Sequence, residues 1–177
     1  MAASLLAQYP ELARACIVVL LLAAPTTAGW LRTRPRAAWG LVLVSGVLLA
    51  ALTLLPAAPR ADMMCELAFA PRDLLRVEPL ANIILFVPLT LALTAATRRP
   101  WSAFAIGTGA SLLIELLQLG LPMIGRSCTS TDWVANTVGA GLGAALASLG
   151  LLLADRRAGR DGGDAPRDAE RAGRRPS

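Results

Sequence analysis

The sequence predicts an all-α, polytopic integral membrane protein built as a helical bundle, and three observations carry this prediction. Of the 177 residues, 55% are hydrophobic and only 16% are charged, whereas a soluble domain carries about 25% charged residues. The apolar residues gather in five stretches, each close to the ~20 residues that a helix needs to cross a bilayer. The tryptophans lie at the ends of these stretches, where their amphipathic rings favour the membrane interface. This pattern excludes a soluble globular enzyme.

The five apolar stretches define the expected helices. In chain order, we expect membrane spans at about residues 12–30, 39–55, 80–97, 101–124 and 132–154. The tryptophans that mark their ends are Trp30, Trp39, Trp101 and Trp133. The second and third spans are short for a bilayer, so their ends are the least sharply defined by the apolar pattern.

The distribution of arginine predicts the orientation of the bundle. With five spans, the loop after the first span, the loop after the third span and the C-terminal tail share one side, and they hold 12 of the 17 arginines. The positive-inside rule places that side in the cytoplasm, which gives an N-out, C-in protein. The alternative is a four-span protein whose first apolar run is a cleaved signal peptide, although no A-x-A cleavage site follows that run.

The chain divides into two parts by composition. Residues 1–154 form the expected transmembrane domain. Residues 155–177 are rich in Arg, Asp, Gly and Pro and almost free of large apolar side chains, so we expect a disordered cytoplasmic tail. The basic excess follows the loops and the tail, so it indicates membrane orientation and predicts no nucleic-acid partner.

Five polar side chains lie within the apolar spans, where an acid costs about 2.5–3.5 kcal/mol on insertion scales and is normally functional. Glu115 is 14 residues beyond Trp101, which places it roughly 21 Å from the cytoplasmic face. The other members lie at the outer ends of their spans, so all of them share a similar depth. The expected ligand-binding residues of this outer-leaflet pocket are Asn82, Glu115, Gln118, Asp132 and Asn136. The alternative is structural: a carboxylic acid and amides that hydrogen-bond neighbouring helices.

Further residues complete the expected site. Arg126, in the short outer loop before the last span, is expected to pair with an acid of the pocket or to hold an anionic group beside it. Gly139 and Gly143 belong to a small-residue stripe that lets helices pack closely in lipid. Cys65 and Cys128 are both assigned to outer loops, where they either form a disulfide or stay free. The chain has no histidine and no zinc-like cysteine spacing, so we expect neither a metal nor another cofactor.

Three motifs carry a resemblance to a known family. They are N-x-x-x-F-x-P at residues 82–88, S-x-x-x-E-x-x-Q at residues 111–118, and R-S followed by D-x-x-x-N-T-x-G at residues 126–139. In this combination and order, the chain resembles the VanZ-like membrane proteins. The resemblance implies a bacterial, multi-pass protein of the cell membrane, and the namesake of the family is linked to resistance against the glycopeptide teicoplanin.

Several functions fit this pattern, and they differ in what the polar pocket does. The leading interpretation is an envelope protein that binds a lipid-linked or amphiphilic ligand in addition to membrane lipids, and that lowers susceptibility to glycopeptides. The rival is an intramembrane enzyme in which Glu115 and Asp132 are the catalytic acid and base and Arg126 binds phosphate. A small transporter, or a structural partner of other envelope proteins, fits five spans without a specific residue in its favour.

Overall fold

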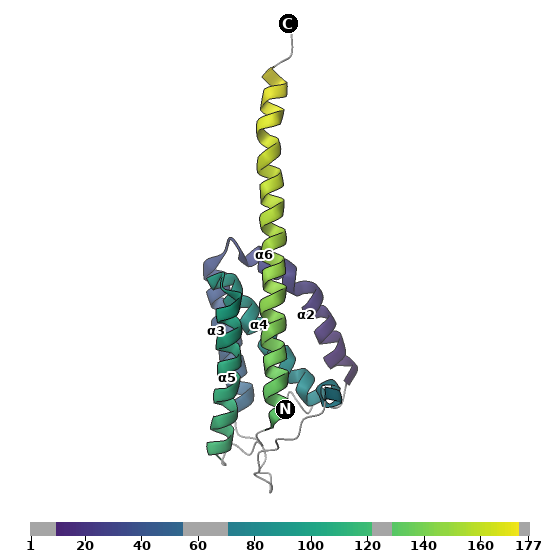
Figure 1. Cartoon of the computed structure of the whole chain (residues 1–177), viewed down its shortest axis with the longest axis vertical. Helices are drawn as coiled ribbons and strands as arrows, with labels where there is room; N and C mark the ends of the chain where they lie inside the picture. The colour runs from purple at the N-terminus through teal and green to yellow at the C-terminus, as the bar shows by residue number, and fades with distance from the viewer. Residues whose placement is uncertain (1–9, 55–70, 122–128, 174–177) are drawn as a thin grey trace.

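A computed structural model of the chain describes residues 10–54, 71–121 and 129–173. Within these ranges, five long helices form a bundle, together with one short 3-10 helix (Figure 1). The long helices are α2 (Pro10–Leu31), α3 (Pro35–Leu54), α4 (Val77–Thr97), α5 (Pro100–Gly120) and α6 (Ser130–Gly173), and the 3-10 helix is η1 (Pro71–Leu75).

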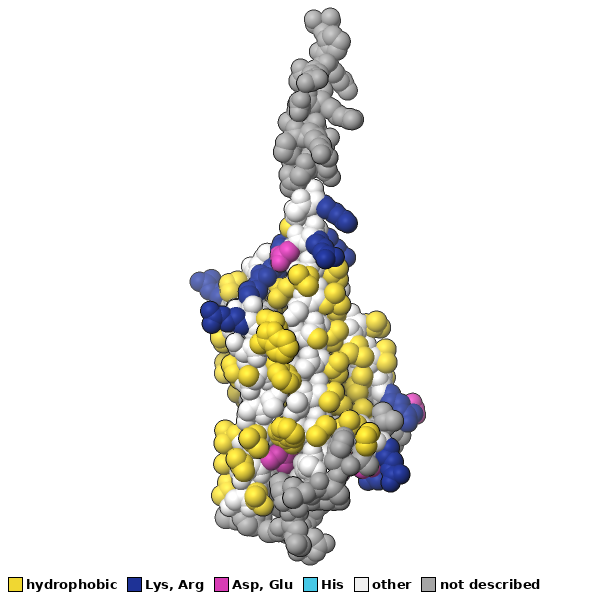
Figure 2. Space-filling model, viewed as in Figure 1, with side chains coloured by type: hydrophobic (Ala, Val, Ile, Leu, Met, Phe, Trp, Pro, Cys, Tyr) yellow, Lys and Arg dark blue, Asp and Glu magenta, His cyan; other side chains and the backbone are white. Residues whose placement is uncertain are grey.

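All five long helices of the described ranges are long and apolar enough to cross a membrane. The predicted all-α membrane bundle with five spans is therefore confirmed, whereas the N-out, C-in orientation stays a prediction. The fold and its apolar helices indicate a multi-pass membrane protein. Large apolar side chains remain exposed along α2, α3 and α5, and Figure 2 shows a broad apolar band on the face of the bundle in view. In lipid this band costs nothing, because the acyl chains are as apolar as leucine.

The helix ends follow from local sequence. Pro35 and Pro100 open α3 and α5, where the fixed backbone of proline suits the first helical turn and its missing N–H is no loss. α4 ends at Arg98, which adopts a left-handed conformation with φ of 59° and donates its backbone N–H to the Thr94 carbonyl oxygen at 2.8 Å. This left-handed cap stops α4 and turns the chain tightly into α5.

α4 is the central helix of the bundle. Most of its side chains between Phe86 and Ala95 are buried, and each of the other long helices packs against it. Its most extensive neighbour is α6, which runs alongside it and then continues well past the end of the bundle (Figure 1). α4 therefore fixes the position of every helix that contributes to the candidate site.

Glycines let α6 approach α4 closely. A Cβ atom at Gly139 would lie 2.6 Å from the carbonyl oxygen of Ile83, and one at Gly143 would collide with Thr90 and the backbone of Val87. The rest of the predicted stripe, Ala135 and Ala147, is also fully buried. The contact is therefore made by backbone against backbone, as small-xxx-small stripes permit in lipid.

The segments that were expected to share the cytoplasmic side lie at one end of the bundle. Arg32, after α2, forms an ion pair of 2.6 Å with Asp155 of α6, and Arg98, after α4, donates a hydrogen bond of 3.2 Å to the Arg32 carbonyl oxygen. Figure 2 shows the basic side chains gathered around the point where α6 leaves the bundle. We call this the arginine end.

Some helix ends differ from the expected spans. α4 begins at Val77 rather than near residue 80, α5 ends at Gly120 rather than near residue 124, and α6 continues to Gly173. Beyond residue 154 the sequence analysis expects a disordered tail, whereas the structure extends the last span as a helix. Propagating an existing helix adds one hydrogen bond per residue without a new nucleation step, which accounts for this extension. Disorder of the tail stays a prediction.

Candidate functional site

The polar side chains of α4, α5 and α6 meet at the end of the bundle opposite the arginine end. α4 starts there, α5 ends there and α6 starts there. We use the name polar cluster for six residues of these helices and of the residue just before α6: Asn82, Ser111, Glu115, Thr129, Asp132 and Asn136.

The first contact of the polar cluster joins α4 to α6. Asn82 donates from Nδ2 to Oδ1 of Asp132 at 2.7 Å, across 50 residues of sequence. Both side chains are partly buried. A hydrogen bond to a carboxylate is stronger than one between neutral groups, so this contact fixes the relative position of the two helix starts.

Glu115 faces protein rather than lipid. α5 buries a single stripe of side chains with spacings of three and four residues, which is one face of a helix, and this stripe ends with Glu115 and Gln118. Only 7% of Glu115 is exposed. Its Oε2 accepts a hydrogen bond of 3.3 Å from the backbone N–H of Thr129, and Asp132 lies within electrostatic reach. Two carboxylates from different helices therefore lie close enough to interact electrostatically.

Asn136 lies one helical turn beyond Asp132 and deeper in the bundle, with 3% of its surface exposed. It donates from Nδ2 to Oγ of Ser111 at 2.9 Å, which joins α6 to α5. Its other side-chain atom, Oδ1, is buried and has no hydrogen-bond partner among the described residues. A buried acceptor without a partner costs about 1–3 kcal/mol, so Oδ1 is a point where a donor from a ligand or a water would be favourable.

Thr129 is a member of the polar cluster that the sequence analysis does not identify. It precedes α6, and its Oγ1 accepts a hydrogen bond of 3.0 Å from the backbone N–H of Asp132. This is the N-cap geometry, in which a threonine side chain satisfies a free N–H of the first turn. The sequence contains a signal for this cap, because a threonine three residues before an acid has the spacing of a capping box. The cap also directs the Thr129 backbone N–H toward Glu115.

The side-chain hydrogen bond of Gln118 leads to α3 rather than to the other members of the expected site. Gln118 donates from Nε2 to the backbone carbonyl oxygen of Thr53 at 3.0 Å, in the last turn of α3. Carbonyl groups in the last turn of a helix lack partners within the helix, so Gln118 satisfies one of them and ties α3 to α5. The structure thus gives this buried amide a bridging contact at the edge of the polar cluster.

Three residues of the expected site lie outside the described residues: Arg126, Cys65 and Cys128. The proposed roles of Arg126 and of a disulfide therefore stay predictions. Cys16, on α2, is exposed with a free thiol. Among the described residues, no three His, Cys, Asp or Glu side chains come together as metal ligands.

Chemically, the polar cluster is rich in acceptors. It combines the carboxylates of Glu115 and Asp132 with Oδ1 of Asn136, which has no partner among the described residues. Such a set suits a ligand with hydroxyl, amide or amine donors.

Comparison with known protein families shows to which family the chain belongs. The family model described as VanZ/LLP1 matches residues 13–153, which include all five long helices up to the arginine end and the whole polar cluster. The chain belongs to the VanZ/LLP1 family. The resemblance seen in the sequence motifs is thereby confirmed for this VanZ/LLP1 protein. Neither the curated proteins nor the solved structures give a match to it.

Proposed function

We propose that this VanZ/LLP1 protein resides in the bacterial cell membrane and lowers susceptibility to glycopeptide antibiotics such as teicoplanin. In this proposal the polar cluster binds a lipid-linked or amphiphilic ligand of the cell envelope. Membership of the family supports the antibiotic phenotype. The geometry supports the ligand site, because acids and amides of three helices converge at one face of the bundle.

One observation carries the proposal: a buried acid and a free buried acceptor lie in the same cluster. Glu115 is buried on the protein-facing stripe of α5, and Oδ1 of Asn136 has no partner among the described residues. A purely structural set of polar groups would be expected to satisfy its own acceptors, because buried polar groups in native proteins are nearly always paired. The unused acceptor therefore favours a ligand that supplies a donor.

The expected ligand follows from the hydrogen-bonding character of the cluster. Carboxylate oxygens and an amide oxygen accept hydrogen bonds, so the ligand presents donors such as sugar hydroxyls or peptide N–H groups. Its lipid or acyl part would lie along the exposed apolar side chains of the long helices. Lipid-linked envelope precursors and lipoglycopeptide antibiotics share this chemistry of a polar head on an apolar anchor.

The proposal is tested by deletion and complementation in the native host or a related bacterium, with teicoplanin and vancomycin compared. Complementation with the wild-type chain should restore the inhibitory concentration of teicoplanin. Glu115→Ala and Asn136→Leu should fail to restore it. Ser148→Ala is the matched control, because the Ser148 hydroxyl bonds only the Ala144 carbonyl oxygen of its own helix. Membrane levels of each variant are measured by immunoblot.

Three results would contradict the proposal. If deletion leaves the inhibitory concentrations of both drugs unchanged, the protein does not affect glycopeptide susceptibility. If both cluster variants rescue fully at normal membrane levels, the polar cluster is not the site responsible for the phenotype. Loss of rescue by Ser148→Ala as well would show that the phenotype reports stability rather than the polar cluster.

One observation favours a second candidate, an intramembrane enzyme that acts on a lipid-linked head group. Glu115 and Asp132 lie within electrostatic reach of each other, and paired carboxylates can divide the roles of general acid and general base. Incubation of the purified protein with lipid-linked substrates, followed by mass spectrometry, separates the two candidates. A product that is lost in Glu115→Gln favours the enzyme, whereas retention of unmodified lipid favours binding alone.

A further inference from the structure

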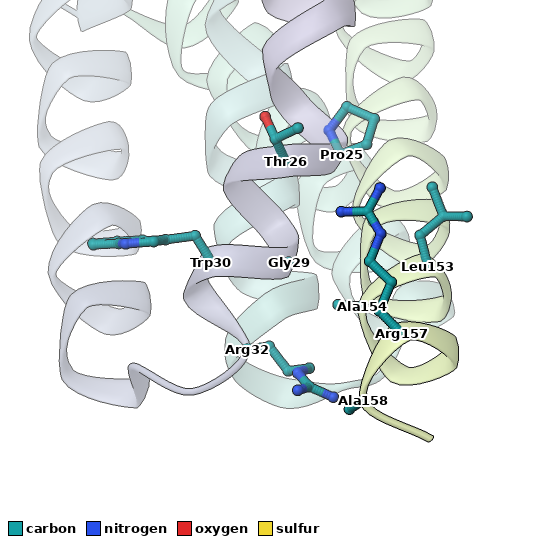
Figure 3. A pocket seen from close by; sticks show the side chains of 10 residues that line it. Pro25, Thr26, Gly29, Trp30, Arg32, Leu153, Ala154, Arg157 and Ala158 are labelled. Carbon is teal, nitrogen blue, oxygen red and sulfur yellow. The ribbon is translucent and has the colours of Figure 1, made fainter. Parts of the chain in front are cut away.

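A hollow lies at the arginine end, opposite the polar cluster. It is a pocket of about 380 Å³ between the C-terminal part of α2 and α6. Figure 3 shows side chains from both helices around it. Its polar lining comes from Thr26, Arg32 and Arg157, and its apolar rim includes Trp30 and Leu153.

The hollow exists because the two helices touch closely at one point and carry small side chains beyond it. A Cβ at Gly150 would collide with the backbone of Pro25, so α2 and α6 are in backbone contact there. Toward the arginine end, the facing residues are Gly29, Ala154 and Ala158. The two helices stay close along this seam, since a Cβ at Gly29 would lie 3.4 Å from the Ala154 Cβ, and its small side chains leave the pocket open.

The two arginines of the pocket are in different states. Arg32 is held by Asp155 in an ion pair of 2.6 Å. Arg157 is exposed, and no ion pair of its guanidinium is found within the described part of the chain. Figure 3 shows the Arg157 side chain extended along the gap between α2 and α6 toward Pro25. The guanidinium therefore lines the pocket and is exposed at the same time.

The surroundings of the pocket favour an anion. Among residues 10–54, 71–121 and 129–160, the arginine end carries a single acid, Asp155, against a set of basic residues: Arg32, Arg34, Arg36, Arg98, Arg99, Arg156, Arg157 and Arg160. The pocket also opens beside a lipid-facing side chain, since Leu153 on its rim is substantially exposed. A basic hollow between helices at the membrane face is the setting in which anionic lipid head groups bind.

We propose that this pocket binds the phosphodiester head group of an anionic phospholipid from the adjoining leaflet. Arg157 contacts the phosphate, because its forked guanidinium suits phosphate oxygens. Arg32 adds positive charge at the other side, and the acyl chains follow the seam between α2 and α6 past Leu153. In the predicted orientation this is the cytoplasmic leaflet, whose surface is negatively charged. The site is distinct from the polar cluster and does not depend on its function.

The test is native mass spectrometry of the full-length protein in mild detergent, titrated with phosphatidylglycerol, with phosphatidylcholine, or with phosphatidylglycerol plus inorganic phosphate. Wild type should retain one phosphatidylglycerol in preference to phosphatidylcholine. Arg157→Gln should weaken this retention about fivefold, since one arginine near a lipid head group contributes about 1 kcal/mol. The matched control is Arg156→Gln, which removes the same charge from the same helix but from a residue outside the pocket lining.

A second variant tests the pocket by a gain of binding. Asp155→Asn releases Arg32 from its ion pair, so phosphatidylglycerol should bind more tightly by a few fold. A weakened or unchanged affinity in Asp155→Asn contradicts the assignment of Arg32 to the site.

The remaining outcomes also decide the proposal. Equal weakening by Arg157→Gln and Arg156→Gln shows nonspecific attraction to a basic surface and overturns the site. Equal retention of phosphatidylcholine removes the requirement for an anionic lipid. Displacement of the lipid by millimolar inorganic phosphate assigns the pocket to soluble phosphate, and likewise overturns the lipid proposal.

Discussion

Substitution of Gly139 by alanine tests the contact that positions the polar cluster. Gly139 lies on α6 one turn beyond Ala135 in the small-residue stripe, and it packs directly on the backbone of α4. An added Cβ would lie 2.6 Å from the carbonyl oxygen of Ile83 and 3.0 Å from its Cα. These are backbone atoms in the middle of a helix, so they cannot rotate away as a flexible side chain would. The helices must move apart.

The magnitude follows from two opposing terms. Replacing glycine by alanine within a helix is favourable by about 1 kcal/mol. Overpacking a close contact costs typically about 1–3 kcal/mol, and the upper end applies here because backbone meets backbone. Gly139→Ala should therefore lower the free energy of unfolding by up to about 2 kcal/mol. It should also loosen the Asn82–Asp132 hydrogen bond, which depends on the same helix pair.

The control is Gly109→Ala on α5, where an added Cβ meets nothing within 4 Å. That variant should be neutral or stabilised by about 1 kcal/mol, because only the helix-propensity term applies. In thermal unfolding of the purified protein in detergent, the two variants should differ by roughly 4–12 °C, at about 2–4 °C per kcal/mol. Equal melting temperatures for Gly139→Ala and Gly109→Ala would refute the backbone contact between α4 and α6.

Three other predictions concern the site and the orientation. A double-mutant cycle of Asn82→Ala and Asp132→Ala should give a coupling energy of about 0.6–1.7 kcal/mol, the range for hydrogen bonds between membrane helices; additive effects would contradict the contact. Gln118→Leu removes the donor to the Thr53 carbonyl oxygen, so hydrogen exchange in the last turn of α3 should accelerate about fivefold for a bond worth ~1 kcal/mol, and unchanged exchange would contradict the bridge. A fluorescent reporter fused to the C-terminus should be active in the cytoplasm, and a periplasm-dependent phosphatase in its place should be inactive; the reverse result overturns the N-out, C-in prediction.

Much of the fold could be predicted because lipid imposes a simple rule on sequence. A spanning helix needs a long apolar run, so hydropathy alone identifies five helices and their approximate centres. The ends are less accessible to this reasoning, since they depend on caps and turns rather than on hydropathy. The left-handed conformation of Arg98, for example, has no counterpart in the composition of the loop.

The convergence of the polar side chains could be predicted from their depth in the membrane. Counting residues from the membrane faces places Asn82 and Asp132 at one level, and the structure joins them by a hydrogen bond. The partner of Gln118 was not accessible, because a backbone carbonyl group exists at every residue and leaves no mark in the sequence. The S-x-x-x-E-x-x-Q motif of residues 111–118 places its three polar residues on one side of α5, and the structure buries Ser111 completely.

The polar cluster also has an order of assembly. Its members on α4 and α5 are synthesised first, and their partners arrive only with α6, the last long helix of the described ranges to leave the ribosome. In a nascent chain that ends after α5, Thr129 has not yet been added. Glu115 therefore lacks the backbone N–H that donates a hydrogen bond to it in the folded bundle. Since an acid costs about 2.5–3.5 kcal/mol in the membrane interior, insertion of α6 relieves that cost as it closes the bundle. Completion of the polar cluster and closure of the described bundle are therefore one event in biogenesis.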